Sequence, residues 1–145
     1  MNTYDVVIIG GGAAGLSAAL VLTRARRRVL VVDSGMPRNA PAAHMQGFLS
    51  RDGMPPADLL AAGRAEVRGY GGTITTGAAK DLVRCGGRTG FQVLLDDGER
   101  VAARRLLVAT GLRDELPGVP GLKERWGRDV LHCRRSVQSS CRGKV

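Results

Sequence analysis

A glycine-rich hexapeptide near the N-terminus constrains the fold of this chain more than any other feature. Residues 10–15 read GGGAAG and satisfy the pattern G-x-G-x-x-G. An apolar, largely β-branched run at residues 4–9 precedes the hexapeptide, and residues 13–25 continue from it with helical periodicity. A second apolar run, residues 29–32, ends at Asp33. The sequence therefore predicts a strand, a glycine turn, a helix and a second strand in immediate succession.

Each part of this unit has a physical role at a bound dinucleotide. Gly10 allows a tight exit from the strand, Gly12 leaves room for a pyrophosphate, and Gly15 lets the helix pack against the strand. The N–H groups of the first helical turn, at the positive end of the helix dipole, neutralise the phosphates. Asp33, 18 residues beyond Gly15, can accept hydrogen bonds from both ribose hydroxyls of an adenosine. An acid there disfavours a 2′-phosphate, and with it NADP.

The next part of the chain is predicted to hold one long loop and two further elements. Residues 34–56 are rich in glycine and proline and show no period. A loop of this length inside a domain is usually functional. A helix is expected at residues 58–70 and a strand at residues 73–76.

A small antiparallel meander is predicted at residues 82–84, 91–95 and 100–102, with its tightest turn at Asp97-Gly98. A separate apolar strand follows at residues 105–109, and a linker rich in proline and glycine comes after it. The predicted fold class is α/β, Rossmann-like, with a parallel sheet plus this small antiparallel β-meander.

Composition argues against several other kinds of protein. The net charge is +9, but the cations are spread along the chain without interleaved aromatic residues, so no nucleic-acid partner is expected. No apolar run approaches the roughly 18 residues that span a bilayer, and the N-terminus lacks a signal-peptide pattern. We therefore expect no membrane partner and a cytoplasmic location. The three cysteines, an odd number without zinc spacing, do not indicate a disulfide framework.

Both FAD and NAD use this glycine fingerprint, and the second half of the chain favours FAD. An ordinary NAD domain continues with another helix and more parallel strands. Here a long loop and a helix lead into a meander, and then into an apolar strand that ends in Ala109-Thr110-Gly111. A small-residue exit from a parallel strand lies at the sheet edge where open α/β proteins bind ligands.

These segments together resemble the thioredoxin reductase-like group of flavoproteins with two dinucleotide-binding domains. The resemblance runs from Tyr4 to about Cys133. The part between residues 37 and 53 is similar to a bacterial subgroup that includes dithiol oxidases of natural-product pathways. The residues that carry the resemblance are VVIIGGGAAGLSAAL at 6–20, VVDSG at 31–35, PRN at 37–39, HMQGFLSRDG at 44–53 and LLVATGLRDELPGVPG at 106–121.

The resemblance implies FAD as cofactor, NADPH as electron donor in a complete homologue only, and a small-molecule or protein disulfide as substrate. It also implies a set of cofactor-binding residues. For His44 two readings stay open, an approach to the flavin ring or a solvated loop residue. The implied contacts are Gly10, Gly12, Ala13, Ala14 and Gly15 at the pyrophosphate, Asp33 at the adenosine ribose, Arg38 and Asn39 on the flavin side, Ala79 at the adenine, and Ala109, Thr110 and Gly111 after the last strand.

The chain departs from this group at Cys133. Members of the group carry a C-x-x-C pair there, in which one thiolate attacks and its neighbour resolves the intermediate. Here the next cysteine is Cys141, eight residues later, so Cys133 is the candidate catalytic thiol of an incomplete pair. A second glycine fingerprint and the segment that returns to complete the FAD domain are also absent from the 145 residues.

We therefore expect residues 1–133 to be the N-terminal part of an FAD-binding domain, incomplete and inactive alone, and residues 134–145 to be a disordered basic tail. A change of reading frame near Cys133 or a naturally short protein would both explain this organisation. Two functions stay open, the FAD-binding portion of a disulfide oxidoreductase and a non-catalytic half-domain or pseudoenzyme. A homodimer or a complementing chain is expected to cover the exposed sheet edges.

Overall fold

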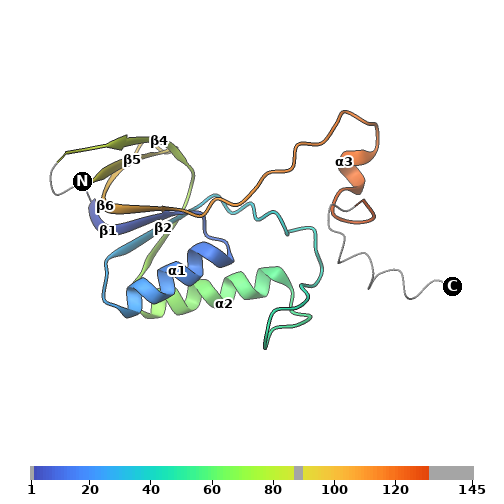
Figure 1. The fold of residues 1–145 in the computed structure, drawn as a ribbon, viewed down its shortest axis with the longest axis horizontal. Helices are drawn as coiled ribbons and strands as arrows, with labels where there is room; N and C mark the ends of the chain where they lie inside the picture. The colour runs from blue at the N-terminus through green and yellow to red at the C-terminus, as the bar shows by residue number, and fades with distance from the viewer. Residues whose placement is uncertain (1, 87–89, 131–145) are drawn as a thin grey trace.

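The computed structural model describes residues 2–86 and 90–130, which form one mixed sheet with two long helices on one of its sides (Figure 1). Cys133 and the predicted tail lie outside this part of the chain. The elements are β1 (Asn2–Ile9), α1 (Ala13–Arg24), β2 (Val29–Asp33), α2 (Pro56–Gly69), β3 (Thr73–Thr76), β4 (Ala79–Arg84), β5 (Phe91–Leu95), β6 (Arg100–Val108) and α3 (Leu122–Arg125).

The strand order within the described residues is β3-β2-β1-β6-β5-β4. Strand β1 pairs in parallel with β2 on one side and with β6 on the other, and β3 extends the parallel part beyond β2. Strands β4 and β5 add an antiparallel ribbon next to β6. The predicted α/β class, a parallel sheet with an antiparallel meander, is confirmed.

Strand β2 and the second half of β1 are buried on both faces, which explains their continuous apolar sequence. Neighbouring residues of β1 point to opposite faces, so Ile8 joins the core under the helices and Val7 joins the core under the meander. Helices α1 and α2 cover the first face through Leu16, Ala19, Leu60 and Val67. The second core contains Val7, Leu30, Val32, Val93, Leu95, Val101 and Ala103.

The prediction of two separate strands at residues 100–102 and 105–109 is wrong, because β6 is continuous. Its first residues pair antiparallel with β5, and the stretch from Val101 to Val108 pairs parallel with β1. Arg104 and Arg105 interrupt the apolar pattern, but both side chains are exposed and the backbone continues through them. Arg104 also lies 3.4 Å from Asp5 of β1 in an ion pair. Two successive arginines can therefore be accommodated in a strand when both side chains reach solvent.

The other elements lie close to their predicted positions. Helix α2 begins two residues early, at Pro56, where proline suits the first helical turn. The Asp97-Gly98 turn is confirmed, since Leu95 N–H donates to Glu99 O at 2.8 Å. Helix α3 was not predicted, because its four residues are too few to show a period. No helix among the described residues combines the length and apolar character that crossing a bilayer requires.

Candidate functional site

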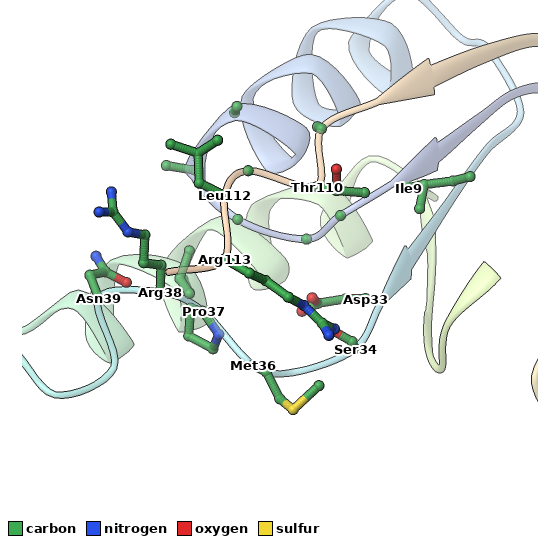
Figure 2. Close-up of a pocket in the computed structure, with 18 of the residues that line it drawn as sticks. Ile9, Asp33, Ser34, Met36, Pro37, Arg38, Asn39, Thr110, Leu112 and Arg113 are labelled. Carbon is green, nitrogen blue, oxygen red and sulfur yellow. The ribbon is translucent and has the colours of Figure 1, made fainter. Parts of the chain in front are cut away.

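A cavity of about 910 Å³ lies at the carboxyl ends of β1, β2 and β6 (Figure 2). This volume is near the upper end of the roughly 300–1,000 Å³ found for small-molecule pockets. The position is the edge at which open α/β sheets bind ligands. The walls come from the glycine turn, the first part of the loop after β2, the turn before β4, the segment after β6, and residues around Trp126.

Close backbone contacts hold the strand ends together at the floor of the cavity. Gly10 N–H donates to Val32 O, and Ala109 N–H donates to Ile9 O, both at 2.8 Å. A Cβ on Gly10, whose φ is +109°, would lie 2.3 Å from Ala109 O. A Cβ on Gly15 would lie 1.9 Å from Gly10 O. No side chain fits at either glycine, as the sequence argument for Gly15 anticipated.

The N-terminus of α1 opens into the cavity at Gly12. A Cβ built on Gly12 meets no atom within 4 Å, so the space beside it is free. The first backbone hydrogen bond of the helix joins Leu16 N–H to Gly12 O at 2.9 Å. The N–H groups of Ala13, Ala14 and Gly15 precede that bond, and no described side chain caps the helix. These donors and the helix dipole together can bind an anion.

Asp33, at the tip of β2, faces the same cavity. Its Oδ2 lies 2.8 Å from Nη2 of Arg64, and its Oδ1 accepts the N–H of Gly35 at 3.2 Å. Partial burial acts to raise the pKa of Asp33, but hydrogen bonds from Arg64, Gly35 and Gly11 outweigh it, and the pKa is lowered. Asp33 is therefore a fixed, ionised acceptor at neutral pH.

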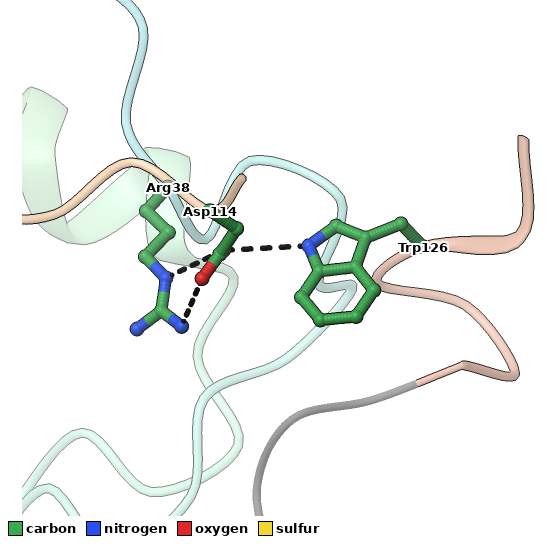
Figure 3. Close-up of polar contacts among 3 residues, drawn as sticks. All are labelled: Arg38, Asp114 and Trp126. Atoms are coloured by element: carbon green, nitrogen blue, oxygen red, sulfur yellow. Dashed lines mark hydrogen bonds and ion pairs between the residues drawn. The ribbon is translucent and has the colours of Figure 1, made fainter. Parts of the chain in front are cut away.

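Three side chains that line the cavity, and that lie away from the glycine turn in sequence, contact one another (Figure 3). Arg38 donates two hydrogen bonds to Asp114, from Nε at 2.8 Å and from Nη2 at 2.7 Å. The indole N–H of Trp126 donates to the same carboxylate at 3.3 Å. We call this group the Arg38–Asp114–Trp126 clasp. It joins the loop after β2 to the segment after β6 and to the residue that ends α3.

The structure brings eleven of the twelve predicted cofactor-binding residues to this one cavity. Gly15 lies behind them in the helix–strand contact, and the candidate thiol Cys133 lies outside the described residues. His44 is also away from the cavity wall, with its Nδ1 3.0 Å from Gly53 O. The residues that line the cavity are Gly10, Gly12, Ala13, Ala14, Asp33, Arg38, Asn39, Ala79, Ala109, Thr110 and Gly111.

Sequence reasoning missed several residues that shape the site. A Cβ on Gly11 would lie 2.5 Å from Asp33 Cγ, so this glycine lets the carboxylate pack against the turn. Arg113 also lines the cavity, and Figure 2 shows its side chain extending toward the tip of β2. Asp114 and Trp126 belong to segments that looked like a linker. The position of Asp114 shortly after the Ala109-Thr110-Gly111 exit was the available signal, and no comparable signal marked Trp126.

The parallel sheet, the glycine turn and the cavity at the carboxyl edge define a Rossmann-like α/β protein. The sequence profile of the pyridine nucleotide-disulphide oxidoreductase family matches residues 4–140. The chain therefore belongs to the pyridine nucleotide-disulphide oxidoreductase family.

Similar proteins and solved structures confirm the predicted resemblance to the thioredoxin reductase-like group. Thioredoxin reductase sirT of Leptosphaeria maculans is 38% identical over 136 residues, covering 91% of this chain and 41% of that protein. The crystal structure of HlmI matches with a TM-score of 0.85 and 62% identity, over 89% of this chain and 41% of HlmI. An oxidoreductase from Agrobacterium tumefaciens matches with a TM-score of 0.83 and 46% identity, over 92% and 44%. The chain spans between 34% and 42% of the length of four curated relatives that it matches.

Proposed function

We propose that this chain binds FAD in the cavity and is the FAD-binding portion of an NAD(P)H-dependent disulfide oxidoreductase of thioredoxin reductase-like type. One observation carries the proposal. Eleven residues that the family resemblance assigns to the cofactor line a single cavity, directly beside the free N–H groups that begin α1.

The described residues fit such a cofactor at three points. The open space at Gly12 and the N–H groups of Ala13 and Ala14 suit a pyrophosphate. The ionised carboxylate of Asp33 suits the adenosine ribose hydroxyls. Arg38 and Asn39 line the cavity on the side proposed for the flavin.

Bound FAD would supply two-electron exchange between a pyridine nucleotide and a disulfide. The residues described here would bind and orient the cofactor. The turn at Gly12 would bind the phosphates, Asp33 would accept hydrogen bonds from the ribose, and the clasp would hold the two loops that flank the flavin end. A complete homologue would add the NADPH site. Cys133 is the proposed redox thiol, and Cys141 is too distant in sequence to form the usual pair with it.

A non-catalytic half-domain is the second candidate function. It is supported by the eight-residue spacing between Cys133 and Cys141, which differs from the usual pair. Under this proposal the chain binds a dinucleotide and another subunit supplies the remaining groups.

A protein partner is part of either proposal. Beyond its pairing with β5, strand β6 has β1 on one side and no described strand on the other. Leu107 and Val108 in this stretch are 38% and 63% exposed. An apolar, unpaired edge favours addition of a strand from a second copy or a complementing chain. Sedimentation of the purified chain tests this proposal: Val108→Lys should lower association, and equal association of both proteins would contradict it.

The visible spectrum of the purified full-length chain tests cofactor binding. A yellow protein whose flavin absorbance is bleached by NADPH under anaerobic conditions supports the oxidoreductase. A yellow protein that NADPH leaves unchanged supports the half-domain. A colourless protein that takes up NAD instead would overturn both proposals. The matched control is Gly12→Asp, which should fold and stay colourless because its carboxylate occupies the space proposed for the phosphates.

A further inference from the structure

Arg64 forms an ion pair with Asp33, the proposed ribose acceptor, yet Arg64 does not line the cavity. Asp33 and Leu60 do line the cavity, whereas Arg64, one turn after Leu60 in α2, lies behind the carboxylate. The Arg64 Nη2–Asp33 Oδ2 distance is 2.8 Å, and the two side chains are 28% and 16% exposed. Arg64 is therefore placed to act on a ligand through Asp33 and not by direct contact.

The helix that carries Arg64 is itself fixed in position. Leu60 and Val67 are 7% and 0% exposed in the core beneath α2. A Cβ built on Gly63 would come within 3.2 Å of Leu16 Cδ1, so α1 and α2 are in close contact next to Arg64. The guanidinium consequently projects from a backbone that has little freedom to shift.

The contacts of Asp33 leave acceptor capacity for a ligand. An ionised carboxylate offers about four lone-pair sites on its two oxygens. Arg64 occupies one site on Oδ2, and Gly35 N–H occupies one on Oδ1. Gly11 N–H donates a further hydrogen bond to the same carboxylate, so one of these sites remains for a ribose hydroxyl.

We propose that Arg64 is a positioning residue for adenosine recognition, which orients the Asp33 carboxylate so that its remaining acceptor site faces the ribose hydroxyls. This inference rests on the proposed dinucleotide site. It assigns to Arg64 a role in selecting nucleotides with free ribose hydroxyls, without contact between Arg64 and the nucleotide.

Calorimetric binding of two probes to the full chain, freed of bound nucleotide, tests this role. The probes are ADP and 2′,3′-dideoxy-ADP, which differ only in the ribose hydroxyls. The variants are Arg64→Met, Asp33→Asn and the double variant. Arg68→Met is the matched control, because it removes the same charge from an exposed position on the same helix.

In the native chain we expect ADP to bind about tenfold to a hundredfold more tightly than the dideoxy probe, the range for hydrogen bonds to a charged group. Arg64→Met should remove most of this preference for ADP. The affinities of Arg64→Met and Arg68→Met for the dideoxy probe should be similar. Arg64→Lys should restore part of the preference. In the Asp33→Asn background Arg64→Met should have no further effect, since its action passes through Asp33.

The outcomes separate this inference from the proposed function. A native chain that prefers ADP, together with an Arg64→Met variant that keeps the full preference, would overturn the role of Arg64 and leave the dinucleotide site intact. Loss of affinity for both probes by equal factors would also overturn it, because that result indicates a structural role. A native chain that binds neither probe would overturn the proposed function and this inference together.

Discussion

The two ends of the cavity are built by different means. At the α1 end the backbone forms the site: Gly10 and Gly15 leave no room for a side chain, and the donors are main-chain N–H groups. At the opposite end, side chains from separate loops form the site through the Arg38–Asp114–Trp126 clasp. The first end lies within regular elements, whereas the second joins segments that lack regular structure apart from the single turn of α3.

This difference determines what a substitution can do at each end. A Cβ added at Gly10 or Gly15 would lie 2.3 Å or less from a backbone oxygen, so the fold cannot accommodate a methyl group there without moving a strand. An ion pair with a partner that is 45% exposed, by contrast, is screened by water and contributes little to stability. We therefore expect changes at the α1 end to act on folding or on phosphate binding, and changes at the clasp to act on loop geometry.

Gly10→Ala should have the largest effect on stability. The added Cβ would lie 2.3 Å from Ala109 O, and φ of +109° strains any residue with a side chain. Overpacking and backbone strain together should lower the free energy of unfolding by roughly 3 kcal/mol. Urea unfolding followed by circular dichroism measures this loss. A decrease below about 1 kcal/mol would show that the strand ends can separate more easily than the contact implies.

Gly12→Asp should separate binding from folding at the same turn. Gly12 has φ −76° and ψ −175°, which other residues adopt readily, and open space for a side chain. An aspartate at this N-cap position can bond the free N–H groups of α1, so stability should rise by a few tenths of a kcal/mol or more. ADP affinity should fall about tenfold to a hundredfold, because the carboxylate replaces and repels the phosphate. Calorimetry and urea unfolding on the same protein check both effects.

Gly12→Ala serves as the control for charge. If Gly12→Asp and Gly12→Ala leave ADP binding unchanged, the phosphates do not lie at the start of α1. If both variants lose stability, the turn is packed more tightly than the structure indicates, and the comparison between the two ends weakens.

The contrast between the ends also explains what could be predicted from the sequence. The glycine pattern, the flanking strands and Asp33 were all foreseen, because short-range backbone geometry demands particular residues at fixed spacings. The partners of Asp33 and Asp114 were not, since Arg64 is 31 residues from Asp33 and Arg38 is 76 residues from Asp114. Such pairs depend on how loops and helices pack in three dimensions. The single strand β6 was missed for a related reason, because solvent exposure of Arg104 and Arg105 is a tertiary property.

Asp114→Asn should alter the clasp with only a small change in stability. The bidentate pair with Arg38 loses its charge, and about 0.5 kcal/mol or less of stability should be lost after solvent screening. The indole of Trp126 would lose a charged acceptor for its N–H. Because Trp126 is the only tryptophan of the chain, its fluorescence emission reports the change directly.

Glu115→Gln is the matched control for the clasp, because it removes the same charge from the neighbouring exposed residue. We expect Trp126 emission of this variant to match that of the native chain. An equal emission change in both variants would mean that Trp126 senses net charge and not the Asp114 contact. The loops at that end would then be held by other interactions.

The smallest expected effect is a dependence of stability on pH that arises from Asp33, the carboxylate at the α1 end. Its pKa in the folded chain lies below the usual value of about 3.9. The unfolded chain therefore binds the proton first as the solution is acidified, and the stability that Asp33 contributes above that usual value is lost as pH falls through the folded pKa. The difference in urea midpoint between the native chain and Asp33→Asn should shrink between about pH 5 and pH 3. Burial acting alone would raise the pKa of Asp33 and give the opposite trend, a relative gain by the native chain in acid. The sign of the trend thus decides whether hydrogen bonds from Arg64, Gly35 and Gly11 outweigh burial at this carboxylate.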